Sequence, residues 1–405
     1  MFDQNFDVVV IGAGMAGLAC AARLRARAVS NFCIIDEQRN VGDSWRQRFE
    51  HLRLNSPFHE LPHDAGLRQQ WGPLLHRTEL VDYLESYVEL HQLTPLMRFG
   101  ERVASVAYAG GSWQVRTAAG RYQTRFLVVA TAVNRVPRWP RIAGRNCFAG
   151  RSLHSSEYWN AEPFRDLRVL VIGSGNSGAD IALDLIEGGA KSVALWIRAP
   201  RHVLSVEAYA RAAGIARRMG VAFTSQDFAD KHRYTKHHPN WHEQVAEQNR
   251  FFESFSIDLS DYGIRRPADG PATETHALGR IPWFDSGTAE EIRSGRIEVI
   301  DGNCQGLAAF TREGVRFTGG ERSFHSVIFG TGFVPQLEDF LDGRDGLLHW
   351  DEMRCCLMPK TDGRCRSAVR PNVFFPGFDE SLNSTLSLGL WGAEVADKIA
   401  EALEN

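Results

Sequence analysis

Two glycine-rich turns, each lying between an apolar run and a helical pattern, limit the folds open to this chain more than any other feature. The turn at 12–17 reads GAGMAG and follows the run FDVVVI, and the turn at 173–178 reads GSGNSG and follows RVLVI. Each run has the continuous apolar character of a buried parallel strand, and apolar residues at helical spacing follow each turn. The sequence therefore predicts an α/β fold with two Rossmann-like dinucleotide-binding domains.

The first turn has the pattern GxGxxG, in which each glycine has its own task. Gly12 permits the tight turn, Gly14 lets the backbone approach a diphosphate, and Gly17 allows the helix to pack closely on the strand. Asp36 ends the next apolar run, where an acidic side chain binds a ribose hydroxyl and repels a 2′-phosphate. This combination predicts a site for FAD or NAD.

The second turn repeats the pattern with Gly173, Gly175 and Gly178, but its following strand ends differently. Arg198 stands where the acid would be and Arg201 follows it, and arginine in this place accommodates a 2′-phosphate. The three polar residues of the turn are predicted to contact the phosphates: Ser174, Asn176 and Ser177. We therefore expect NADPH here, and an FAD-type turn with an NADPH-type turn is typical of a flavoprotein that relays hydride.

Composition excludes several other classes of protein. The chain of 405 residues has a formal net charge of -3, which argues against a large nucleic-acid interface. It contains no run of about 18 apolar residues, so we expect no membrane span, and its start lacks the basic region of a signal peptide. Seven scattered cysteines without a framework spacing are typical of a reduced, cytoplasmic protein. A homodimer is one assembly that we consider.

The segment FAGRSLHSSEY at 148–158 carries a resemblance to a known family. Its pattern FxGxxxHxxxY resembles the identifying motif of the class B flavin-containing monooxygenases and lies just before the second glycine turn, as in that family. FGTGF at 329–333 resembles the family's linker, and the segment 261–300 resembles the plant auxin-type (YUCCA) enzymes. The resemblance extends over nearly the whole chain.

The resemblance implies a monooxygenase that uses FAD, NADPH, O2 and a small organic substrate. NADPH would reduce FAD, O2 would form a flavin C4a-(hydro)peroxide, and one oxygen atom would enter the substrate. We favour N- or S-oxygenation, because Baeyer–Villiger enzymes carry Trp where this chain has Tyr158. Two alternatives stay open: Baeyer–Villiger chemistry or oxidative decarboxylation of a keto acid such as indole-3-pyruvate, and a redox sensor that merely oxidises NADPH.

The resemblance also implies site residues. Asn55 and His154 are placed at the catalytic centre, Asn55 as a hydrogen-bond donor and His154 chiefly as a residue that orients the link between the domains. Asn55 could instead cap a turn, and His154 could be a satisfied core histidine. Further cofactor contacts are expected from the GDSWR segment and the linker: Trp45, Arg46, Thr331, Gly332 and Phe333.

The two turns imply a discontinuous first domain. We expect the FAD domain at 1–165 and 325–405, and the NADPH domain at 166–324 with an insertion at about 202–280 that shapes the substrate pocket. The histidine-rich segment 232–242 is not expected to bind metal, because Pro239 interrupts the helical spacing of His238 and His242. Disulfide reductases share two such turns, but their CxxxxC pair is missing, since residues 37–57 contain no cysteine.

Overall fold

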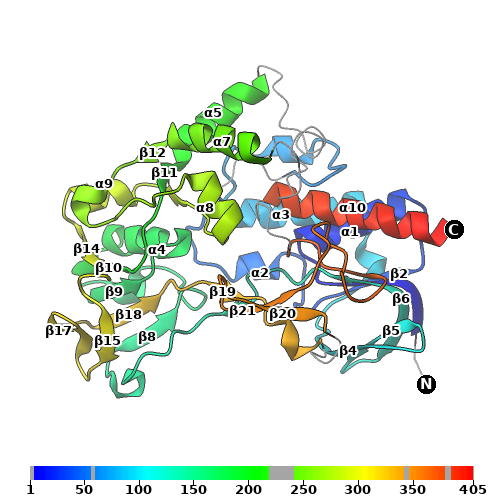
Figure 1. Cartoon of the computed structure of the whole chain (residues 1–405), viewed down its shortest axis with the longest axis horizontal. Helices are drawn as coiled ribbons and strands as arrows, with labels where there is room; N and C mark the ends of the chain where they lie inside the picture. Colours follow the sequence, from blue (N-terminus) through cyan, green and yellow to red (C-terminus); the bar gives the residue numbers. More distant parts are fainter. Residues whose placement is uncertain (1–3, 56–59, 219–240, 342–345, 379–384, 405) are drawn as a thin grey trace.

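The computed structural model describes residues 4–55, 60–218, 241–341, 346–378 and 385–404, which form two α/β domains side by side (Figure 1). The first domain is built on a seven-stranded sheet of order β3-β2-β1-β6-β5-β4, with β22 beside β6. Its strands are β1 (Gln4–Ile11), β2 (Phe32–Ile35), β3 (Met97–Arg98), β4 (Val103–Ala109), β5 (Ser112–Thr117), β6 (Arg121–Val129) and β22 (Val373–Phe374). Strands β3, β2, β1, β6 and β22 run parallel, as the apolar runs predicted, and β4 and β5 are antiparallel.

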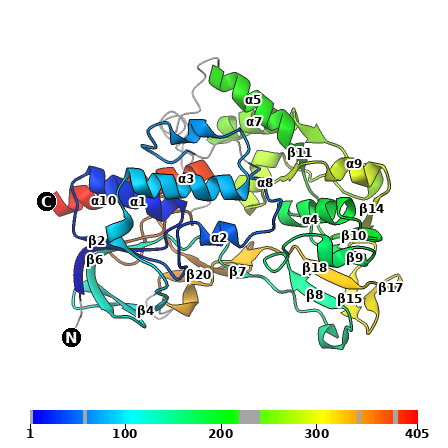
Figure 2. The same ribbon diagram turned by 180° about the vertical axis from the view of Figure 1, so that it is seen from behind.

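Helices cover one face of this sheet (Figures 1 and 2). They are α1 (Met15–Ala26), α3 (Arg77–Leu90) and α10 (Thr385–Glu404), with the short α2 (Asp43–Arg46) nearer the middle of the molecule. Helix α1 is apolar on nearly every side because it lies between the sheet and α10. The two helices approach so closely that a Cβ atom on Gly392 would lie 2.1 Å from the carbonyl oxygen of Ala16.

The second domain is built on a parallel sheet of order β14-β10-β9-β18-β8. Its strands are β8 (Arg151–His154), β9 (Arg168–Ile172), β10 (Ser192–Ile197), β14 (Ile297–Asp301) and β18 (Ser326–Phe329). The chain moves outward from β9 to β10 and β14, while β18 lies on the other side of β9. In open parallel sheets such a reversal marks the crevice that binds ligands, and the second glycine turn follows β9.

Other elements flank the second sheet. Helices α4 (Asn176–Glu187) and α9 (Thr288–Arg293) pack on one face, and an antiparallel sheet packs on the other: β15 (Leu307–Phe310), β16 (Gly314–Phe317) and β17 (Gly320–Ser323). The insertion forms a small sheet, β11 (Val203–Ser205), β12 (Ser256–Ile257) and β13 (Trp283–Asp285), with helices α5 (Val206–Arg218), α7 (Trp241–Glu253) and α8 (Pro271–Leu278). Figure 1 shows α5 and α7 at the outer edge, above α8 and α4.

The chain crosses between the domains twice, and the two crossings pair with each other. Strand β7 (Val136–Pro137) lies antiparallel to β19 (Phe333–Val334), at the centre of the molecule in both views (Figures 1 and 2). The pair β20 (Leu348–Asp351) and β21 (Cys356–Pro359) follows in the first domain. Strands β8 and β18 belong to the second sheet. We therefore propose that the domain boundaries lie near residues 130–150 and 330, in place of the expected 165 and 325.

The contact between α1 and α10 predicts the result of a single added methyl group. Gly392→Ala should push α10 away from α1 and lower the free energy of unfolding by about 1–3 kcal/mol, the usual cost of overpacking a core. Thermal unfolding of the FAD-loaded protein measures this effect. The control is Gly72→Ala, because a Cβ there meets no atom within 4 Å. Equal Tm values for the two variants would contradict the packing that we describe.

Candidate functional site

The first glycine turn joins β1 to α1, and each of its glycines has a separate structural reason. Gly12 has φ +106°, and a Cβ there would lie 2.5 Å from the carbonyl oxygen of Ala130. A Cβ on Gly17 would lie 1.9 Å from the carbonyl oxygen of Gly12. A Cβ on Gly14, however, would meet nothing within 4 Å. Two glycines therefore close the turn, and the third leaves an open face on which a diphosphate can lie against the backbone.

The N-terminus of α1 has no side-chain cap among the described residues, and its first turn contains no acidic residue. Helix α3 of the same domain, in contrast, has a complete capping box formed by His76 and Glu79. Uncapped N–H groups and the helix dipole favour an anion. The beginning of α1 therefore fits the diphosphate of a dinucleotide.

Asp36 lies just after β2, at the same edge of the sheet. Its Oδ2 accepts a hydrogen bond from the N–H of Ala13 at 2.6 Å, and its Oδ1 accepts one from Gln38 at 2.8 Å. Burial raises the pKa of Asp36 above its ordinary value. Thr131, after β6, adds a buried hydroxyl without a partner among the described residues. Sequence reasoning missed Thr131, although its place at the carboxyl end of an apolar strand could have indicated it.

The GDSWR segment contributes less directly. Trp45 packs partly buried against the first core. The guanidinium of Arg46 pairs with Asp43 at 3.1 Å and with Glu85 at 2.5 Å, so its charge is already shared by two carboxylates. Contacts of Trp45 and Arg46 with a cofactor therefore stay predictions.

The second glycine turn repeats the design of the first. Gly173 has φ +108°, and a Cβ there would lie 2.4 Å from the carbonyl oxygen of Gly330, just after β18. A Cβ on Gly178 would lie 2.0 Å from the carbonyl oxygen of Gly173, whereas Gly175 faces open space. Helix α4 also begins without a side-chain cap or an acid in its first turn. This turn fits a second diphosphate for the same physical reasons.

The polar residues of this turn differ in their surroundings. The side chain of Asn176 is directed to the insertion: its Oδ1 accepts from the N–H of Phe284 at 2.7 Å, and its Nδ2 donates to Pro282 O at 3.3 Å. Ser174 is buried and Ser177 is half-buried. Asn176 thus ties β13 to the glycine turn, and its predicted phosphate contact would come from its backbone.

Arg198 and Arg201 follow the carboxyl end of β10, where the sequence predicted a 2′-phosphate site. Arg198 is exposed, and its guanidinium has no hydrogen bond or ion pair with the part of the chain that is described. Arg201 is half-buried, its Nε lacks a partner among the described residues, and burial lowers its pKa. Both arginines fit a phosphate. A third arginine, Arg266, lines the same pocket as Arg201 but pairs with Glu253 at 3.4 Å.

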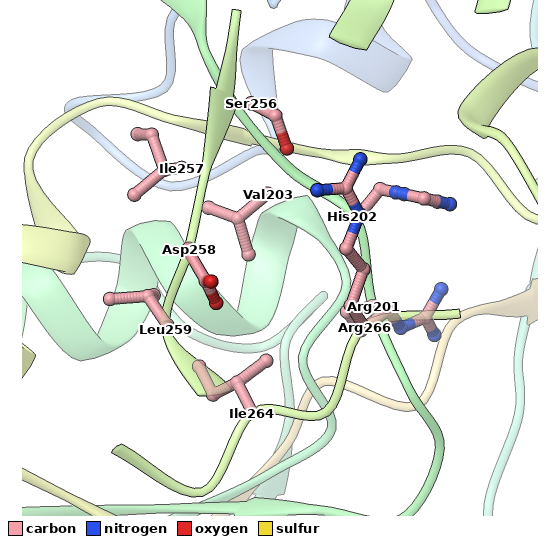
Figure 3. A pocket seen from close by; sticks show the side chains of 9 residues that line it. All are labelled: Arg201, His202, Val203, Ser256, Ile257, Asp258, Leu259, Ile264 and Arg266. Carbon is pink, nitrogen blue, oxygen red and sulfur yellow. The ribbon is translucent and has the colours of Figure 1, made fainter. Parts of the chain in front are cut away.

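Arg201 also lines a pocket of about 220 Å³, a volume that includes space open to solvent. Figure 3 shows its basic side chains on one side, from Arg201, His202 and Arg266, and Ile257, Asp258 and Leu259 on the other. All of the lining residues come from the second domain and its insertion. The pocket therefore lies beside the predicted phosphate site and not between the two glycine turns.

His154, at the end of β8, holds the link between the domains. It is fully buried, its Nε2 lies 3.0 Å from the carbonyl oxygen of Gly332, and its Nδ1 accepts from the N–H of Ser156 at 3.1 Å. The ring also packs edge-on against Phe333 at 5.1 Å. Both ring nitrogens of His154 are engaged and burial lowers its pKa, so its surroundings suit a residue that positions the link, and this role stays a prediction. Thr331 reinforces the link by donating to the carbonyl oxygen of Arg138 at 2.6 Å.

Tyr158 lies in the core of the second domain and contacts α4. Its side chain is 1% exposed, its hydroxyl donates to Asp184 on α4 at 2.5 Å, and its ring lies against Phe49 and Phe164. A residue held in this way fixes α4 to the end of the motif. This packing does not test which reaction the enzyme performs, so the preference for N- or S-oxygenation stays a prediction.

Asn55 is half-buried and follows Leu54, whose N–H donates to the carbonyl oxygen of Leu75 at 2.8 Å. It precedes residues outside the described part, so its role stays a prediction. In the histidine-rich segment, His232, His237 and His238 also lie outside the described residues, and His242 lies in α7. Among the described residues there is no cluster of three metal-ligating side chains and no helix suited to cross a bilayer. None of the seven cysteines forms a disulfide.

Comparison with known proteins agrees with this arrangement. Residues 9–211 match the family model described as pyridine nucleotide-disulphide oxidoreductase. The fold resembles that of a flavin-containing monooxygenase from Stenotrophomonas maltophilia, with a TM-score of 0.68, 20% identity and 99% of each chain covered. It also resembles cyclohexanone monooxygenase from Rhodococcus sp. Phi1 bound to NADP+, with a TM-score of 0.72, 20% identity, and 99% of this chain and 85% of that chain covered.

Sequence relatives are more similar. The chain is 34% identical over 341 residues to the indole-3-pyruvate monooxygenase YUCCA1 of Oryza sativa subsp. japonica, covering 82% of this chain and 78% of the relative. It is 33% identical to the probable indole-3-pyruvate monooxygenase YUCCA1 of Arabidopsis thaliana, covering 83% and 78%. The chain belongs to the family of the YUCCA enzymes, among the class B flavin monooxygenases, and is a monooxygenase that depends on FAD and NADPH.

Proposed function

We propose that this enzyme oxidatively decarboxylates a 2-keto acid with an aromatic side chain, of the type of indole-3-pyruvate. The observation that carries the proposal is the 34% identity, over 82% of the chain, to a relative named for that substrate. The keto acid, O2, NADPH and a proton would give the shortened carboxylic acid, CO2, water and NADP+. One oxygen atom of O2 enters the acid and the other leaves as water.

The preference for N- or S-oxygenation rested on Tyr158, and the contact of Tyr158 with Asp184 does not test it. N- or S-oxygenation stays an alternative. Bound FAD and NADPH supply the reducing equivalents and the activation of O2. The protein's part is to hold the two dinucleotides at the uncapped starts of α1 and α4, and to fix the domains at the link between His154 and Gly332.

Isotopically labelled O2 tests the proposed reaction. With indole-3-pyruvate, the FAD-loaded enzyme should oxidise NADPH faster and yield indole-3-acetate with one labelled oxygen atom in its carboxylate, as measured by mass spectrometry. A labelled N- or S-oxide from an amine or sulfide, without turnover of any keto acid, would support the alternative. Release of one hydrogen peroxide for each NADPH, whatever the substrate, would indicate a redox sensor.

Arg198 predicts the coenzyme preference. Removal of its guanidinium in Arg198→Ala should raise KM for NADPH roughly tenfold or more, the usual worth of a charge-assisted phosphate contact, and leave KM for NADH nearly unchanged. Steady-state kinetics with each coenzyme measure this. The control is Lys191→Ala, an exposed residue just before β10, at the opposite end of that strand. Equal changes in both KM values would rule out the 2′-phosphate role.

Asn55 can be tested against its simpler interpretation as a turn cap. If its amide donates a hydrogen bond at the reaction centre, both Asn55→Ala and Asn55→Asp should keep flavin reduction by NADPH but release more hydrogen peroxide and less product. If it only caps a turn, Asn55→Asp should behave like the unchanged enzyme, because aspartate caps turns equally well. The ratio of product formed to NADPH consumed is the measurement.

His154 predicts a pH dependence of stability. Its pKa is lowered chiefly by burial and also by the charge of Arg48, against opposing effects of Gly332 and Glu157. Below pH 6.5 the unfolded chain therefore binds a proton that the native ring resists, and stability falls by up to about 1.4 kcal/mol per pH unit until the lowered pKa is reached. Between pH 7.5 and 5.5, the Tm of His154→Asn should fall less than the Tm of the control His349→Asn, whose substituted residue is exposed. Parallel curves would refute this assignment.

Two broader expectations accompany this proposal. A cytoplasmic location is supported by seven cysteines of which none forms a disulfide, because structural disulfides belong to oxidising compartments. The homodimer stays a prediction, and sedimentation of the purified protein measures it directly.

A further inference from the structure

Arg48 belongs to the first domain by sequence, but its surroundings belong to the second. It follows α2, and its neighbour Phe49 is 3% exposed within the core of the second domain, together with Leu153 and Tyr158. The next residue, Glu50, donates its N–H to the carbonyl oxygen of Trp159 at 2.7 Å. These contacts fix the backbone of Arg48 at the junction, beside the family motif.

The side chain of Arg48 carries a charge without a counter-ion. Its guanidinium carbon lies 4.6 Å from the centre of the Phe333 ring. Phe333 directly follows Gly332, whose carbonyl oxygen contacts His154. It makes no hydrogen bond or ion pair with any described residue. Burial lowers the pKa of Arg48, and no carboxylate contributes to that change. Arg48 is half-buried, so its charge is only partly solvated and an anionic ligand would be favourable here.

The position of Arg48 indicates which anion can reach it. Gly330 touches the second glycine turn, because a Cβ on Gly330 would lie 2.9 Å from the Cα of Gly178. Phe333, which Arg48 covers, is three residues further on, a span of at most about 10 Å. The uncapped N-terminus of α4 begins at the same turn. Arg48 therefore lies at the crevice of the second sheet, on the side of the first domain.

We propose that Arg48 binds the diphosphate of NADP(H), as the contact by which the first domain holds the dinucleotide of the second. The helix start and Arg48 would then approach the diphosphate from opposite domains, so that binding of the coenzyme stabilises the junction. The inference rests on the use of NADPH and is independent of which substrate is oxygenated.

Equilibrium binding to the FAD-loaded enzyme tests this proposal. Isothermal titration calorimetry should show NADP+ binding about ten- to a hundredfold more weakly to Arg48→Met than to the unchanged enzyme. Adenosine 2′-monophosphate, which lacks the diphosphate, should bind both proteins within about twofold of each other. Arg48→Lys keeps the charge and should recover part of the loss. Arg53→Met is the matched control, because Arg53 is exposed on the same segment.

The outcomes separate the proposal from its rivals. Unchanged NADP+ affinity in Arg48→Met would overturn it, as would equal weakening of NADP+ and adenosine 2′-monophosphate. A raised KM for a keto acid with normal NADP+ binding would assign the charge to a substrate carboxylate instead, and loss of FAD alone would assign it to the flavin. If Arg48→Met does not fold, Arg48→Lys provides the test, because loss of the planar guanidinium should still weaken NADP+ binding several-fold. Failure of keto-acid oxygenation leaves these binding results unaffected.

Discussion

The close contact between strand and helix at each glycine turn is the constraint on which the rest of this structure depends. At Gly17 and Gly178 a single methyl group would collide with the carbonyl oxygen of the first glycine of the same turn. Because the helices approach so closely, their first N–H groups are turned to an open face instead of to a capping side chain. The cost of leaving these groups unpaired is recovered when a diphosphate binds. Two such sites in one chain account for the use of two dinucleotides, FAD and NADPH.

The junction between the domains turns two binding sites into one enzyme. The two crossings pair as β7 and β19, and His154 fixes the second crossing through Gly332. Tyr158 joins the same motif to α4 through Asp184, while Phe49 brings the first domain into the core of the second. A motif that reads as an irregular segment thus sets the relative position of the two sheets. We propose that its histidine, His154, acts on the geometry of the link and not on the substrate.

The sequence predicted features that depend on short-range rules. Apolar strands, glycine turns, the acid after β2 and the arginine after β10 all follow from spacing within about 30 residues of chain. It could not predict that Asn176 holds Phe284 or that Tyr158 holds Asp184, because such partners are chosen by the fold. The sequence also contained no indication that Arg48 binds a ligand. What distinguishes Arg48 from the neighbouring Arg46 and Arg53 is the contact of its guanidinium with Phe333, which only the fold creates. The assignment of β8 to the second sheet likewise required its pairing with β18.

Hydride can pass from NADPH to FAD only if the two dinucleotide sites face each other across the junction, and this arrangement is what we propose. Rapid anaerobic mixing of the FAD-loaded protein with NADPH tests it most directly, with the visible absorbance of oxidised flavin as the signal. The structure predicts that this absorbance disappears in a single turnover, at a rate that saturates with NADPH concentration. Persistent oxidised flavin in a protein shown to bind both FAD and NADPH would contradict the arrangement of the two domains described above.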